Sequence, residues 1–131
     1  MSACILVVDD NQLNRKLILE ILRLGGYQAF AACGGEEGVD LARSRRFDLI
    51  LMDIQMPGVD GLEATRRIRR EGASAGTPIV AVSALPRAAD RARALAAGCA
   101  GYLDKPHGVE VLLDAVLRYL PPAAIPGTAA R

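Results

Sequence analysis

Acidic side chains directly follow two apolar runs of the chain. Asp9 and Asp10 follow Cys4-Ile5-Leu6-Val7-Val8, and Asp53 follows Leu49-Ile50-Leu51-Met52. If these runs are neighbouring parallel strands, their carboxyl ends place three carboxylates in one crevice. Carboxylates that close repel one another unless a cation shares the site. Oxygen ligands with few protein donors suit Mg²⁺, which keeps several waters and binds phosphate oxygens. The pattern therefore predicts a divalent-metal site.

The segments around these acidic residues alternate between strand and helix patterns. Apolar runs predict strands at about 4–8, 27–32, 47–52, 78–83 and 100–103. Helices are expected from Leu13 to the Gly25-Gly26 pair and at about 35–44, 61–70, 86–97 and 108–120. The apolar stripe of the first helix, with Leu13, Leu17 and Ile21 four residues apart, is expected mainly in the core. Val109 is likewise expected on the apolar face of the last helix.

Five strands alternating with five helices predict an α/β domain with a parallel sheet covered on both faces. The run 47–52 is apolar apart from Asp48, as expected of a central strand. No internal repeat or second domain is visible, so one domain is expected over 1–120. The segment 121–131, rich in Pro, Ala and Gly, is expected to be a disordered tail.

Further polar residues fall at the ends of the later strands. Ser83 ends the fourth strand, and Lys105 follows the fifth. Phosphoryl transfer needs a nucleophile, a metal and donors that hold the phosphoryl oxygens. A carboxylate can be the nucleophile and form an aspartyl-phosphate. Asp53, in the central strand, is best placed for that role, while Asp10, with Asp9 behind it, holds the metal. Ser83 and Lys105 supply the donors.

Composition excludes several other classes of function. The 131 residues carry a formal net charge of +1, which gives no bulk attraction to nucleic acid or an anionic membrane. No apolar run spans a bilayer, and the N-terminus lacks a signal-peptide pattern, so a cytoplasmic protein is expected. The arginines of the third helix end are expected to form a solvated face; they are Arg66, Arg67, Arg69 and Arg70. Cys4, Cys33, Cys99 and the single His107 do not make a zinc site.

Taken together, these motifs resemble the receiver domain of two-component response regulators, from about Ser2 to Leu120. The resemblance is carried by Val7-Val8-Asp9-Asp10-Asn11, by Leu51-Met52-Asp53-Ile54-Gln55-Met56-Pro57-Gly58-Val59-Asp60-Gly61, by Val82-Ser83-Ala84 and by Lys105-Pro106. It implies a flavodoxin-like fold with strand order 2-1-3-4-5. Both a single-domain regulator and the receiver of a hybrid kinase fit the resemblance.

The resemblance also implies roles for individual residues. Asp53 would accept a phosphoryl group from a phosphohistidine on a sensor kinase or histidine phosphotransfer protein. Mg²⁺ would be bound by the side chains of Asp10 and Asp53, by the backbone carbonyl of Gln55, and by Asp9 through water. Tyr102 stands where the family has a switch aromatic that turns inward when Ser83 moves towards the phosphate. Such a protein is a signalling receiver with self-catalysed phosphotransfer and slow autodephosphorylation, and it is not an enzyme acting on outside substrates.

Three further expectations follow from the same resemblance. Leu85, two residues after Ser83, cannot orient a water by hydrogen bonding, so self-dephosphorylation should be slow. Asn14, Arg15 and Lys16 lie on the helix that meets the helical bundle of the kinase side in this family. The Lys105–Pro106 peptide bond is expected to be cis. The downstream partner and the oligomeric state stay open.

Two other functions compete with a receiver. A metal-dependent phosphatase with an aspartyl nucleophile needs a general-acid carboxylate two residues after it, where this chain has Gln55. A flavin-binding electron carrier on the same fold needs a phosphate-cradling loop after the first strand, where Asp9 and Asp10 would repel phosphate. A degenerate receiver that only scaffolds is disfavoured because the site residues are all present.

Overall fold

The computed structural model describes residues 3–83, 88–104 and 108–121. Within these ranges, five parallel strands form one sheet in the order β2-β1-β3-β4-β5. The strands are β1 (Cys4–Val8), β2 (Gln28–Ala32), β3 (Leu49–Asp53), β4 (Ile79–Ser83) and β5 (Gly101–Asp104). The helices are α1 (Gln12–Leu24), α2 (Gly35–Ser44), α3 (Gly61–Arg70), α4 (Ala88–Ala97) and α5 (Val109–Tyr119). This is the flavodoxin-like α/β fold that was expected.

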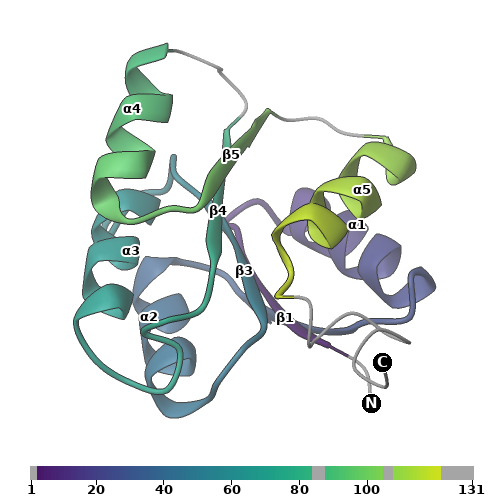
Figure 1. The fold of residues 1–131 in the computed structure, drawn as a ribbon, viewed down its shortest axis with the longest axis horizontal. Coiled ribbons are helices and arrows are strands. Elements are labelled where there is room, and N and C mark those ends of the chain that lie inside the picture. Colours follow the sequence, from purple (N-terminus) through teal and green to yellow (C-terminus); the bar gives the residue numbers. More distant parts are fainter. Residues whose placement is uncertain (1–2, 84–87, 105–107, 122–131) are drawn as a thin grey trace.

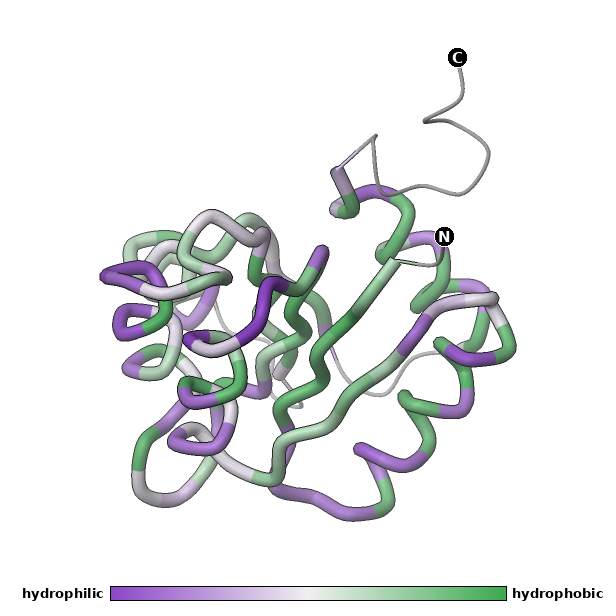
Figure 2. The backbone as a smooth tube through the Cα atoms, turned by 90° about the horizontal axis from the view of Figure 1, so that it is seen from below, coloured by the Kyte–Doolittle hydropathy of each residue, from purple (hydrophilic) through white to green (hydrophobic). Residues whose placement is uncertain are grey.

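The helices cover both faces of the sheet. Figure 1 shows α2, α3 and α4 on one face and α1 and α5 on the other. Successive residues of a strand point to opposite faces, so Leu6 and Val8 enter one core cluster while Ile5 and Val7 enter the other. The centre of the sheet is accordingly hydrophobic along its strands (Figure 2). None of the helices in the described ranges is long and apolar enough to cross a bilayer.

The buried face of α1 differs from the expected stripe. The side chains of Leu13 and Leu17 are 79% and 54% exposed, whereas Ile21 and Leu22 are buried. An α-helix has 3.6 residues per turn, so residues four apart drift steadily around its surface. The buried face therefore runs beside the predicted stripe, through Ile18, Ile21 and Leu22. Val109, placed inside α5 by the same argument, is also exposed.

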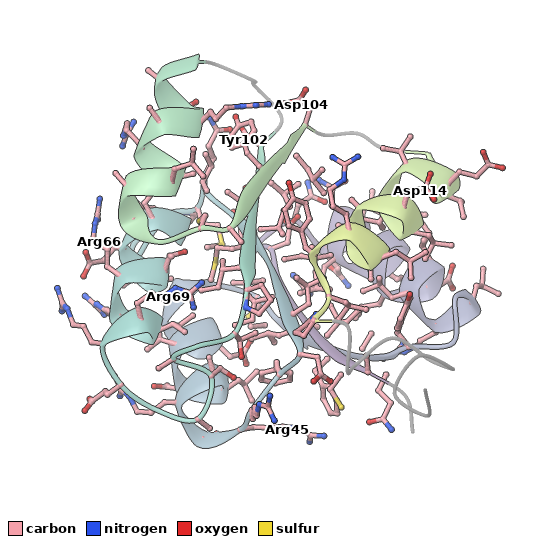
Figure 3. All side chains as sticks on the ribbon, viewed as in Figure 1. Arg45, Arg66, Arg69, Tyr102, Asp104 and Asp114 are labelled. Carbon is pink, nitrogen blue, oxygen red and sulfur yellow. The ribbon has the colours of Figure 1, made fainter. Side chains whose placement is uncertain are left out.

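One arginine of α3 is not part of a solvated face. The guanidinium of Arg69 donates hydrogen bonds to the carbonyl oxygens of Gly98 (3.0 Å), Ala75 (3.0 Å) and Thr77 (2.5 Å). Burial lowers the pKa of Arg69 from its ordinary value. Figure 3 shows Arg69 turned towards the sheet and Arg66 at the outer edge of the molecule. Arg69 thus ties the end of α3 to the loops at the amino ends of β4 and β5.

Candidate functional site

The two strands that carry the acidic residues are direct neighbours. β1 and β3 pair in parallel, with Val8 opposite Met52. Asp9 and Asp53, the next residue of each segment, therefore reach the same edge of the sheet. One carboxylate oxygen from each of Asp9, Asp10 and Asp53 lies within 4.8 Å of the other two. The predicted cluster of three carboxylates is present at the carboxyl edge of the sheet.

Asp9 is held by the start of α1. Its side chain is buried, and its Oδ1 accepts a hydrogen bond from the backbone N–H of Asn11 (2.8 Å). The side chain of Asn11 caps α1 by accepting from the backbone N–H of Asn14 (3.0 Å). Arg15 donates to the backbone carbonyl of Asp9 (2.8 Å). Asp10, the third member of the cluster, is exposed.

The support that Arg15 gives to Asp9 was not predicted from the sequence. Arg15 lies six residues after Asp9 and one turn into α1. Such a position offers no local spacing signal, because the contact depends on how α1 leaves the strand. Arg15 was expected to contact a partner protein, whereas its guanidinium contacts the backbone of the site.

Asp53 occupies the end of the central strand. It is 6% exposed, and its Oδ1 accepts a hydrogen bond from the backbone N–H of Gln55 (3.1 Å). Asp side chains often accept such a hydrogen bond from the backbone two residues later, in a tight turn. The chain therefore turns next to the carboxylate. Gly61, the first residue of α3, packs so close to Asp53 that an added Cβ would overlap its carbonyl oxygen. A glycine is therefore required where α3 begins.

Ser83 and Tyr102 belong to β4 and β5, the two strands beyond β3 on the side away from β1. Asp53 pairs with Val82 of β4, so Ser83 follows directly beside it, fully buried. Tyr102 pairs with Ala81 and is 8% exposed on the α4 side of β5 (Figure 3). Its hydroxyl is buried and has no hydrogen-bond partner among the described residues. The guanidinium carbon of Arg91 lies 5.7 Å from the centre of the Tyr102 ring.

The donor set fits a hard divalent cation. Asp9 and Asp53 are buried carboxylates, Asp10 adds a third, and no soft sulfur ligand belongs to the cluster. Three like charges within 4.8 Å are unfavourable without a counter-ion. Lys105, Pro106 and Leu85 lie outside the described residues.

Comparison with known proteins places this arrangement in a family. Residues 5–117 match the response regulator receiver domain. The polar-differentiation response regulator DivK of Brucella anthropi is 38% identical over 120 residues, which cover 92% of this chain and 98% of that protein.

Solved structures agree with this match. The chemotaxis protein CheY4 of Vibrio cholerae has a TM-score of 0.87 and 31% identity, covering 92% of this chain and 100% of that one. The receiver domain of a sensor histidine kinase from Pseudomonas aeruginosa, solved with a magnesium ion in its active-site cleft, has a TM-score of 0.84 and 36% identity. The match covers 91% of this chain and 98% of that domain. The chain therefore belongs to the receiver domain family of response regulators, the phosphoacceptor switches of two-component signalling.

Proposed function

We propose that this receiver takes a phosphoryl group from a phosphohistidine onto Asp53 in a Mg²⁺-dependent reaction, and that phosphorylation changes its partner-binding surface. The donor is a sensor histidine kinase or a histidine phosphotransfer protein. The observation that carries the proposal is the meeting of Asp9, Asp10 and Asp53 within 4.8 Å at the carboxyl edge of the sheet. The magnesium-bound relative from Pseudomonas aeruginosa supports the choice of metal.

The residues divide the work of phosphoryl transfer. The side chains of Asp10 and Asp53 and the backbone carbonyl of Gln55 would hold Mg²⁺, with Asp9 acting through water. The bound metal would neutralise charge on the phosphoryl oxygens. A carboxylate oxygen of Asp53 attacks phosphorus while the phosphorus–nitrogen bond of the phosphohistidine breaks. The leaving imidazole keeps the bonding electron pair.

Two donors complete the site in this proposal. Lys105 and Ser83 donate to phosphoryl oxygens as charge builds on them. Ser83 is supported for this role by its buried position beside the end of β3. Gln55, which has no carboxylate, cannot act as the general acid that a phosphatase for outside substrates needs.

Phosphorylation would be read through β4 and β5. The new phosphate accepts a hydrogen bond from the Ser83 hydroxyl, and the inward position of Tyr102 is favoured as Ser83 moves. Tyr102 already lies inward in this structure, so phosphorylation need only raise the population of that state. The surface formed by α4, β5 and α5 would present the change to a partner.

The phosphodonor would dock beside the crevice on α1. Leu13 and Leu17 expose apolar surface there, and Lys16 is exposed next to them. Apolar positions one turn apart on a helix suit contact with another helix. Asn14 and Arg15 are half-buried, so Lys16 is the best polar contact among the three predicted residues.

A second assignment concerns the setting of the domain. The 36% identity to a receiver domain of a sensor histidine kinase favours a place in a hybrid kinase or a relay. The 38% identity to DivK, which is a response regulator, favours a separate regulator. Both use the same chemistry on Asp53.

Labelling with a small acyl phosphate tests the chemistry. With Mg²⁺ present, the wild-type chain should gain one phosphoryl group by intact mass, and Asp53→Asn should gain none. Asp40→Asn, which changes an exposed carboxylate of α2, should label like wild type. Equal labelling of wild type and Asp53→Asn would refute the proposal.

The decay of the label tests the role of Leu85. Leu85→Glu supplies a carboxylate that can orient the attacking water, so the phosphoryl group should be lost faster than from wild type. Leu85→Met keeps an apolar side chain and serves as the control. Equal decay of wild type and Leu85→Glu would remove Leu85 from the account of slow dephosphorylation.

A further inference from the structure

The loop that joins β3 to α3 is fixed well at one end. Residues 54–60 form this loop, and Ile54 and Met56 are both 7% exposed with their side chains in the core. The backbone N–H of Ile54 also donates to the carbonyl of Val82 (3.2 Å). Gln55 lies between the two buried residues, so the first half of the loop is anchored on both sides of it.

The second half of the loop has a different support. Pro57 and Gly58 are exposed, and Gly58 has a φ of 72°, in the left-handed region that favours glycine. Val59 is partly buried and packs at the edge of the core. Its backbone carbonyl lies against Gly35, the first residue of α2, where an added Cβ would overlap the carbonyl oxygen. The backbone of α2 therefore touches the backbone of the loop.

The requirement for glycine at position 35 comes from this contact. Gly34, the preceding residue, has extended backbone, and an added Cβ there would meet no atom within 4 Å. Gly35 has no positive φ that would favour glycine for conformational reasons. The close approach of the Val59 carbonyl, and not a conformational need, therefore explains the glycine at position 35.

The outer side of this half of the loop is open. A groove of about 760 Å³ lies over the contact and is lined by the start of α2 and by Pro57, Gly58 and Val59. Because the outer side is open, a displacement at Val59 is not opposed by packing behind it. The displacement would pass through Gly58 and Pro57 to Met56, the buried residue that fixes Gln55 on its second side.

We infer that Gly35 is a positioning residue for the metal site, because it seats the loop that carries Gln55. The inference rests on the proposed function, in which Gln55 and Asp53 hold Mg²⁺. Groups behind metal ligands commonly change metal affinity about 10–100-fold when altered. Gly35 acts in this way without touching the metal.

A pair of adjacent substitutions tests the inference. Gly35→Ala should weaken Mg²⁺ affinity about tenfold, measured by NMR shifts of the Gln55 and Asp53 amides during a Mg²⁺ titration. Its rate of acyl-phosphate labelling at saturating Mg²⁺ should also fall about tenfold, because a small misplacement of reacting groups is expensive. Gly34→Ala should stay within about twofold of wild type in both measurements.

A third variant separates positioning from general stability. Gly72 has a φ of 109°, and an added Cβ there would meet the backbone of Arg43 at the opposite edge of the sheet. Gly72→Ala should therefore lower the free energy of unfolding while leaving Mg²⁺ affinity unchanged. If Gly35→Ala behaves like Gly72→Ala, with lower stability and normal Mg²⁺ affinity, the inference is wrong.

A milder variant covers the case in which Gly35→Ala does not fold. Val59→Ala removes the loop's apolar contact without introducing an overlap, and it should weaken Mg²⁺ affinity about threefold. Wild-type affinity in Val59→Ala would then overturn the inference. A wild-type chain that binds no Mg²⁺ would refute the proposed function itself, and the wild-type titration is therefore done first.

Discussion

The two edges of the sheet use polar side chains in opposite ways. At the amino edge, the Ser74 hydroxyl accepts from the backbone N–H of Phe47 (2.9 Å) and donates to the carbonyl of Arg45 (2.7 Å). The Thr77 hydroxyl donates to the carbonyl of Phe47 (2.6 Å). These bonds join the loop before β3 to the loop before β4. Polar residues here connect segments that are far apart in the sequence.

At the carboxyl edge, the fold brings like charges together. Asp9 and Asp53 each accept a hydrogen bond from the backbone N–H two residues later, and Asp10 adds its charge within 4.8 Å. These two hydrogen bonds lie within one turn and orient the carboxylates, whereas the bonds at the amino edge join separate loops. We therefore expect the polar residues of the amino edge to contribute more to stability than the close-set carboxylates do.

Loss of Ser74 should give the largest change in stability. Ser74→Ala leaves the buried N–H of Phe47 without its partner, so the free energy of unfolding should fall by about 2 kcal/mol. Chemical denaturation measures the change. Ser44→Ala, which removes an exposed hydroxyl, should change it by less than about 0.5 kcal/mol. An equally stable Ser74→Ala would show that the two edges do not differ as described.

Removal of a carboxylate at the carboxyl edge should raise the free energy of unfolding, whereas Ser74→Ala lowers it. Without Mg²⁺, Asp10→Asn should raise the free energy of unfolding by about 1 kcal/mol, because it relieves repulsion from Asp9 and Asp53. Added Mg²⁺ should stabilise wild type more than this variant. Asp114→Asn, on the exposed face of α5, provides the control. A destabilised Asp10→Asn in metal-free buffer would contradict the comparison.

Tyr102 differs from the polar residues of both edges, because its hydroxyl is buried without a hydrogen-bond partner among the described residues. Its buried hydroxyl has no partner among the described residues, so Tyr102→Phe should raise the free energy of unfolding by about 1 kcal/mol. The ring contact with Arg91 is retained in the variant. Tyr119→Phe, at a half-buried tyrosine, should have less effect. If Tyr102→Phe is less stable than wild type, the hydroxyl is satisfied in solution.

The smallest expected effect is a pH dependence at the amino edge. Burial raises the pKa of the Cys99 thiol above its ordinary value of 9.0. The unfolded chain therefore loses this proton first, and stability falls as the pH rises above 9.0 towards the folded pKa. Cys99→Ala should lose less stability than wild type at alkaline pH. Measurements of the free energy of unfolding below and above pH 9.0 test this. Burial also raises the pKa of Tyr27, so part of the loss should persist.

The carboxyl edge was predictable because its signal is local. A buried parallel strand is a continuous apolar run, and the residue that ends it is visible in the sequence. Asp9, Asp53 and Ser83 were located in this way. That β1 lies next to β3 came from the family resemblance, since no pattern within either run states its neighbour.

The amino edge was not predictable for the same reason. The segment 72–76 reads as a polar turn, yet Ser74 is fully buried and bonds to a residue 27 positions away. Arg69 was likewise expected to be one of four solvated arginines, but it bonds to carbonyl oxygens of two loops. Pairing between loops depends on tertiary structure, which leaves no period in the sequence. Leu13 and Leu17 were misplaced because a spacing of four only approximates the helical repeat.

The proposed site residues come from two halves of the chain, which form two halves of the sheet. All three carboxylates lie within the first 53 residues, whereas Ser83 and Tyr102 belong to the later βα units. The halves of the sheet meet where β3 pairs with β4, with Asp53 opposite Val82. A structural change that passes from Asp53 to the second half of the sheet crosses a single strand spacing of about 4.8 Å.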